Sequence, residues 1–154
     1  IKGDLADYKR FKYMGIEPLS KKFDALHLWS KIKNSSRVLK NIFLDQKVVA
    51  GLGNIYVSEA LWDSKINPKR TGKKTSLADC KKLVVSIKKV LEKAIKYGGS
   101  SIRDYRSTDG TLGNFQSNFK VYNKEGKKIA NDRVKKIVQY GRSTFYCPKL
   151  QNNK

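Results

Sequence analysis

The chain has 154 residues, of which 34 are Lys or Arg and 13 are Asp or Glu, so its formal net charge is +21 at pH 7. No apolar run approaches the ~18–20 residues that a membrane-spanning helix needs. With 39% hydrophobic residues the chain can bury one moderate core, and its two cysteines suggest no disulfide framework. The positive excess indicates a polyanionic partner; a basic membrane-surface protein would have a similar bulk charge.

The first half of the chain has the pattern of a helical domain. Residues 1–20 are mixed and polar and end in a Gly15–Ser20 turn. Apolar spacing predicts helices over 22–33, 37–44 and 54–64, followed by a long helix that Ser76 caps, with Asp79 at the capping-box position. Cys80 lies on the apolar face of that helix and is expected in the core. His27, the only histidine, is interpreted as a partly buried surface residue rather than a ligand.

A glycine-rich turn joins the second and third of these helices. Gly51 and Gly53 bracket Leu52, and Asn54 follows at once as a candidate N-cap. A helix entered from such a turn offers unpaired backbone N–H groups to an anion such as a nucleic-acid phosphate. An ordinary connection between two helices has the same pattern, so these residues alone leave both interpretations open.

The composition changes after the long helix. Residues 98–118 are rich in Gly, Ser, Thr, Asp and Asn, and this stretch is too long for a passive connection. Short β-like runs follow at 119–122, 134–140 and 144–146, and Gly141-Arg142 is predicted to form the tight turn of a hairpin. The sequence therefore predicts a small β module at the C-terminal end.

Several motifs in one order resemble the formamidopyrimidine-DNA glycosylase and endonuclease VIII family, and most closely its formamidopyrimidine branch, which removes oxidised purines. The matching blocks are Gly15–Ser20, Leu44–Tyr56, Glu59–Trp62, Ile66–Pro68, Gly98–Tyr105, Phe119–Tyr122 and Gly141–Pro148. The resemblance implies a mainly α fold with a small β part: a helix–two-turns–helix four-helix domain followed by a C-terminal β-hairpin finger. It divides the chain into a lead-in at 1–20 from a missing N-terminal catalytic domain, the DNA-binding domain at 21–97, a lesion-recognition-like loop at 98–118 and the finger at 119–154.

The resemblance also implies a zinc ion in the finger, held by four cysteines, but this sequence departs from that pattern. The four positions hold Lys127, Ala130, Cys147 and Leu150. One thiolate cannot form a tetrahedral structural site. We therefore expect a finger without zinc and no other cofactor, held by hairpin pairing and by apolar contacts among Val134, Ile137, Phe145, Tyr146 and Leu150, with Cys147 as a packed thiol.

The catalytic start of the family is not matched either. Its members begin with Pro-Glu, whose proline amine forms a Schiff base with the damaged nucleotide, whereas this chain begins Ile1-Lys2-Gly3-Asp4. We therefore expect the C-terminal half of a glycosylase, unable by itself to excise 8-oxoguanine or to cleave an abasic site.

By resemblance, four positions are DNA contacts: Lys40, which points into the lesion site, and Asn54, Tyr122 and Arg142, which contact phosphates. Each also has a simpler interpretation: a solvated lysine, an N-cap, an aromatic of the finger core and a surface arginine. Arg142 is expected at the hairpin tip, where it would also donate a proton in δ-elimination. Ser35 stands where a further lysine is usual. Ser101, Ile102, Arg103 and Tyr105 resemble the loop that closes over an everted 8-oxopurine.

The sequence thus predicts the DNA-binding half of a bifunctional DNA glycosylase and AP lyase of base excision repair, acting as a monomer on damaged duplex DNA. Its location would be the cytoplasm and nucleoid if bacterial, and otherwise wherever the genome is. The alternative is a standalone, non-catalytic module that binds damaged DNA. A ribosome-associated basic protein is disfavoured by the arginine finger and by the 98–105 loop.

Overall fold

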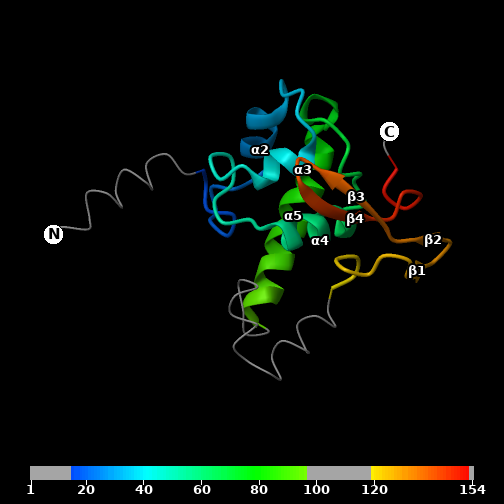
Figure 1. Cartoon of the computed structure of the whole chain (residues 1–154). Helices are drawn as coiled ribbons and strands as arrows, with labels where there is room; N and C mark the ends of the chain where they lie inside the picture. The colour runs from blue at the N-terminus through cyan, green and yellow to red at the C-terminus, as the bar shows by residue number, and fades with distance from the viewer. Residues whose placement is uncertain (1–14, 97–118, 153–154) are drawn as a thin grey trace.

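The computed structural model describes residues 15–96 and 119–152 (Figure 1). Its helices are α2 (Ala25–Ile32), α3 (Leu39–Leu44), α4 (Asn54–Asp63), the short 3₁₀ helix η1 (Gly72–Lys74) and α5 (Leu77–Lys96). Its strands are β1 (Lys128–Ile129), β2 (Asp132–Arg133), β3 (Lys135–Gln139) and β4 (Arg142–Tyr146). The predicted fold, mainly helical with a small β part, is confirmed. No helix of the described ranges is long and apolar enough to cross a membrane.

Two side-chain caps set where helices begin. Asp24 accepts a hydrogen bond from the backbone N–H of His27 at 2.8 Å, so α2 begins after Asp24 and not at residue 22. Ahead of α5, Ser76 and Asp79 exchange the predicted capping-box bonds: Asp79 N–H donates to Ser76 Oγ at 3.1 Å and Ser76 N–H donates to Asp79 Oδ2 at 3.2 Å. At α4 the expectation is wrong: Gly53 is the N-cap, and Asn54 is the first residue of the helix.

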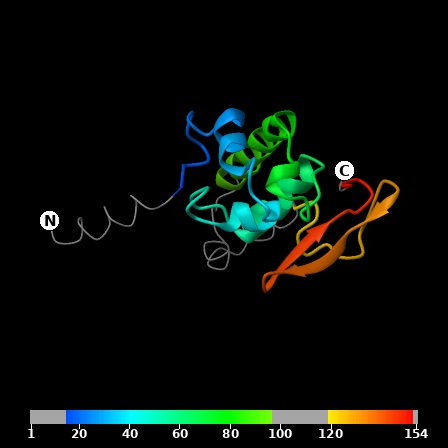
Figure 2. The ribbon, with the colours of Figure 1, turned by 90° about the horizontal axis from the view of Figure 1, so that it is seen from above.

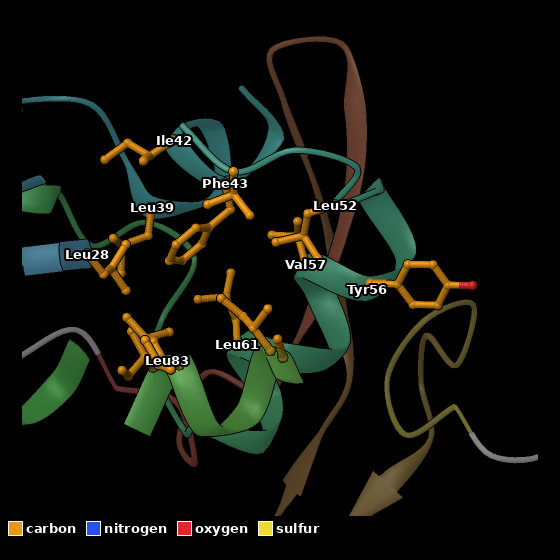
Figure 3. Close-up of a cluster of buried hydrophobic side chains, with 14 of the residues drawn as sticks. Leu28, Leu39, Ile42, Phe43, Leu52, Tyr56, Val57, Leu61 and Leu83 are labelled. Carbon is orange, nitrogen blue, oxygen red and sulfur yellow. The ribbon is translucent and has the colours of Figure 1, made fainter. Parts of the chain in front are cut away.

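The core lies where α2 and α4 pack against α5 (Figure 3). Its members are buried apolar side chains from all four α-helices, among them Leu28, Leu39, Phe43, Val57, Leu61 and Leu83. Cys80 is fully buried among them, as predicted. Close backbone approach also fixes this core, because a Cβ on Gly72 would lie 2.5 Å from the carbonyl oxygen of Ile32. The apolar stripe of α5 therefore anchors the helices that carry the glycine turn.

The finger (residues 119–152) lies along one side of the helical part (Figure 2). It contains two antiparallel hairpins, β1–β2 and β3–β4, and the register of the second pairs Gln139 with Arg142. Tyr140 and Gly141 therefore form its two-residue turn, and both have positive φ, 52° and 78°. This corrects the prediction of a Gly141-Arg142 turn: Arg142 is the first residue of β4, beside the tip.

The start of the finger is a turn rather than the predicted strand at 119–122. The carboxylate of Glu59 on α4 holds this turn by accepting the backbone N–H groups of Lys120, Val121 and Tyr122 at 2.6, 2.9 and 2.9 Å. Burial raises the pKa of the Glu59 carboxyl, although these three bonds oppose the rise. A buried carboxylate thus fixes the finger to the helical domain.

A second, small core fills the finger. Val121, Val134, Phe145 and Cys147 are buried together, with Leu150 and Trp62 packed at the edge. Of the apolar set predicted to hold the finger, Val134, Phe145 and Leu150 belong to this cluster. Tyr146 is buried but is not a member, and the Lys69 ammonium lies 5.8 Å from the centre of its ring. Ile137 lies outside the cluster, because its side of β3 is only partly covered.

Candidate nucleic-acid interface

Two side chains of the helical domain converge on one backbone carbonyl of the finger, that of Ser143 in β4. Asn54 Nδ2 donates a hydrogen bond to this oxygen at 3.0 Å. Lys40 Nζ lies 3.4 Å from the same oxygen and donates to Thr144 Oγ1 at 2.5 Å. We call these four residues the junction. It brings together positions more than 85 residues apart, since the Asn54–Ser143 separation is 89 and that of Lys40–Thr144 is 104.

Lys40 is fully buried, which differs from a lysine that points into an open lesion site. Burial, together with repulsion from the nearby Arg142 guanidinium, lowers the pKa of Lys40 from 10.5 to about 8. The ion pairs of the described residues join Arg37 to Asp45, Arg70 to Asp79 and Lys89 to Asp63, and none of them includes Lys40. Two cations therefore lie close together at the junction without a carboxylate partner for the lysine, and an incoming anion would relieve their repulsion.

Asn54 is the second unusual side chain of the junction. Its amide nitrogen is used by Ser143, while its buried Oδ1 has no hydrogen-bond partner among the described residues. It is not an N-cap, so the simpler interpretation of this residue is excluded. Because Asn54 is the first residue of α4, the unpaired N–H groups of that helix begin at the junction.

Arg142 is exposed at the end of β4, beside a hollow of about 310 Å³. Arg37, Asn41 and Tyr140 also line this hollow, and Arg37 is held at its rim by Asp45, with 3.1 Å between the guanidinium and the carboxylate. Sequence reasoning missed Arg37. The available signal was its position three residues before Lys40. Leu44 and Asp45 complete the lining. A guanidinium such as that of Arg142 can bind an anionic oxygen bidentately.

Tyr122 lies between the two cores. Its ring meets Phe119 edge-on at a centroid distance of 6.1 Å and Phe145 at 5.0 Å. The ring thus packs as an aromatic of the finger core, which is the simpler of its two interpretations. The loop residues Ser101, Ile102, Arg103 and Tyr105 fall outside the described residues.

The four positions of the family's metal site do not fit a zinc ion. They hold one thiol and side chains of Lys, Ala and Leu, and the described residues contain no group of three or more His, Cys, Asp or Glu that could hold a metal. The Cys147 sulfur is fully buried, and its burial and the charge of Asp132 raise the pKa of the thiol. A protonated, packed thiol is a poor metal ligand.

Comparison with known proteins identifies the family to which the chain is similar. The pattern of the Formamidopyrimidine-DNA glycosylase H2TH domain matches residues 14–106. Formamidopyrimidine-DNA glycosylases of Rhodopseudomonas palustris (strain BisB18) and Zymomonas mobilis subsp. mobilis are 48% and 44% identical over 97% of this chain, which spans 54% and 56% of their lengths.

Solved structures agree with the sequence matches. Lactococcus lactis Fpg in complex with DNA that contains an abasic site superposes with a TM-score of 0.84 at 38% identity, covering 98% of this chain and 56% of that chain. The same protein with Fapy-dG DNA gives 0.83 at 37%, with the same coverage. The chain thus spans about half the length of these relatives, and it belongs to the formamidopyrimidine-DNA glycosylase family.

Proposed function

We propose that this chain is the DNA-holding half of a DNA glycosylase and AP lyase that removes oxidised purines in base excision repair. The observation that carries the proposal is the junction, where Lys40 and Asn54 from the helical domain both grip the strand that begins with Arg142. A formal charge of +21 suits binding to a phosphate backbone. Relatives of known structure were solved in complex with abasic-site or Fapy-dG DNA.

Arg142, Asn54 and Lys40 each have a role in this proposal. Arg142 grips the phosphates next to the extruded nucleotide, and the N-terminus of α4 receives a neighbouring phosphate close to Asn54. Lys40 supplies positive charge from a buried position, and its hydrogen bond to Thr144 fixes β4. The Arg142 side chain therefore projects from a rigid strand. In the complete enzyme Arg142 would also donate a proton in δ-elimination, and residues 101–105 would close over the lesion.

Other parts of the proposal concern the surroundings of the site. Tyr122 contacts a phosphate through its hydroxyl while its ring stays in the finger core. The protein binds duplex DNA as a monomer and without zinc, and it works where the genome is, which in a bacterium is the nucleoid.

DNA binding by residues 1–154 tests the proposal. The probe is a short duplex with one tetrahydrofuran abasic analogue, measured by fluorescence anisotropy across a range of salt concentrations. We expect a log–log slope of about −0.9 for each phosphate contacted. Arg142→Ala and Asn54→Ala should each weaken binding about ten-fold or more, because each removes a contact at the same phosphates. Arg133→Ala is the matched control: it removes an exposed finger arginine whose guanidinium donates to the Gly126 carbonyl, away from the junction.

A slope near zero, or equal affinity for the Arg142→Ala, Asn54→Ala and Arg133→Ala variants, would contradict the proposal. The alternative, a non-catalytic module, shares these binding results and differs in chemistry. Borohydride trapping separates the two: a fusion of residues 1–154 to a family N-terminal domain that begins Pro-Glu should form a covalent adduct with an abasic duplex. Arg142→Ala in that fusion should reduce δ-elimination more than base excision.

A further inference from the structure

Asp132, at the start of β2, is a buried carboxylate that the proposed DNA contacts do not use. It is 7% exposed, whereas its chain neighbour Arg133 is exposed. Its Oδ1 accepts the N–H of Arg133 at 2.7 Å. Its Oδ2 accepts the N–H of Lys149 at 2.6 Å and that of Leu150 at 3.1 Å.

These bonds join two separate turns of the finger. Asp132 follows the tight turn at Ala130, whose φ is 52°, and belongs to the first hairpin. Lys149 and Leu150 belong to the turn after β4, 17 and 18 residues further along the chain. Lys149 Nζ lies 3.5 Å from the carbonyl oxygen of Asn131, which adds a weak second contact between the same turns.

A metal bound at the four family positions would connect the same pieces of chain. Two of these positions, 127 and 130, enclose β1, and the other two, 147 and 150, enclose the turn after β4. A structural metal stabilises a small domain by tying such turns together. Here three backbone N–H groups converge instead on one carboxylate, and hydrogen bonds to a charged acceptor are stronger than those to a neutral one.

We propose that the Asp132 carboxylate takes over the structural task of the metal in this finger. It joins the turn after β4 to the first hairpin and so holds the C-terminal end of the strand that begins with Arg142. Asp132 is a positioning residue: it acts on DNA only through the placement of β4. This inference rests on the proposed function for its DNA readout, but not for its structural readout.

The test compares Asp132→Asn with a matched control, Asp24→Asn. Both aspartates accept a backbone N–H group, but Asp24 does so at the start of α2, away from the finger. Asparagine keeps the shape of the side chain and turns an amide N–H₂ group toward donors. We expect Asp132→Asn to weaken binding to the abasic duplex about ten-fold and to speed amide hydrogen exchange at Lys149 and Leu150 about ten-fold. Asp24→Asn should change neither, and a chelator should not change wild-type affinity.

A rescue experiment tests directly whether a metal can replace the Asp132 carboxylate. The variant Asp132→Asn with Lys127→Cys, Ala130→Cys and Leu150→Cys restores four thiols. We expect zinc to return its DNA affinity and its slow exchange near Leu150 toward wild-type values, and a chelator to remove both. If Asp132→Asn alone does not fold, zinc-dependent folding of the four-cysteine variant still decides the matter.

Unchanged exchange at Lys149 and Leu150 in Asp132→Asn would overturn the inference, and so would loss of wild-type affinity in chelator or a four-cysteine variant indifferent to zinc. If wild-type protein fails to bind DNA while Asp132→Asn still shows faster exchange and zinc rescue, the proposed function fails and the role of Asp132 stands.

Discussion

Replacing Lys40 with Met should remove a cost to folding that depends on pH. The ammonium is fully buried, and its pKa falls from 10.5 to about 8. At about 1.4 kcal/mol for each unit of pKa, holding the charged form in the folded state costs roughly 3 kcal/mol. Because the folded-state pKa lies below the unfolded one, this cost is absent above pH 10.5, grows as the pH falls from 10.5 to about 8, and is fully present below pH 8.

The Met side chain fills similar space but leaves the buried Thr144 hydroxyl without its lysine donor, at a cost of roughly 1–3 kcal/mol. At pH 7 we therefore expect Lys40→Met to be as stable as wild type or more stable, by up to about 2 kcal/mol, while it binds DNA more weakly. The more informative quantity is the difference in the free energy of unfolding between wild type and variant. It should shift in favour of wild type by roughly 2–3 kcal/mol between pH 7 and pH 10.

Urea unfolding followed by circular dichroism at both pH values measures this difference, in which the titration of other groups cancels. Lys81→Met, on the exposed face of α5, is the control for removing a lysine charge that is not buried. A wild-type minus Lys40→Met difference that is the same at pH 7 and pH 10 would show that the ammonium is not desolvated, and the account of the junction would be wrong.

Three further predictions concern the frame of the site. Gly72→Ala should lower stability by about 3 kcal/mol or more, because its Cβ would lie 2.5 Å from the Ile32 carbonyl oxygen; an unchanged melting temperature would contradict that contact. Tyr140→Asn should raise stability by roughly 0.5–1 kcal/mol in thermal melting, because a 72% exposed tyrosine has a φ of 52° that asparagine tolerates better, and destabilisation would count against the turn. Glu59→Gln should destabilise by roughly 2–3 kcal/mol and speed hydrogen exchange at Lys120, Val121 and Tyr122, since an amide cannot accept three backbone N–H groups; exchange as slow as in wild type would refute this.

The helical part could be predicted from sequence because its signals are local. The apolar stripe of α5 and the Ser76–Asp79 capping box lie within neighbouring turns of chain, and both appear as expected. Residues 119–122 alternate apolar and polar side chains, which is why they predict a strand. The Glu59 carboxylate that holds them in a turn is 61–63 residues away in the sequence.

The site was predictable only in part. Arg142 and Asn54 could be singled out by resemblance, and their DNA roles stay predictions. The burial of Lys40 depends on Thr144, 104 residues later, and nothing in the local sequence distinguishes this lysine from the other lysines of the chain. Asp132 was missed for the same reason, because its partners Lys149 and Leu150 are 17 and 18 residues further along the chain.

The Gln151 side chain has a practical consequence for handling the protein. It is fully buried; its Oε1 accepts the N–H of Cys147 at 2.7 Å and its Nε2 donates to the carbonyl of Ile66 at 3.0 Å. The backbone carbonyl of Gln151 accepts a hydrogen bond from Asn67 Nδ2 at 2.7 Å. A shortened clone that stops at Leu150 would leave three buried polar groups without partners, so affinity tags belong after residue 152. By the same reasoning, carboxypeptidase digestion of the native protein should stall on reaching Gln151.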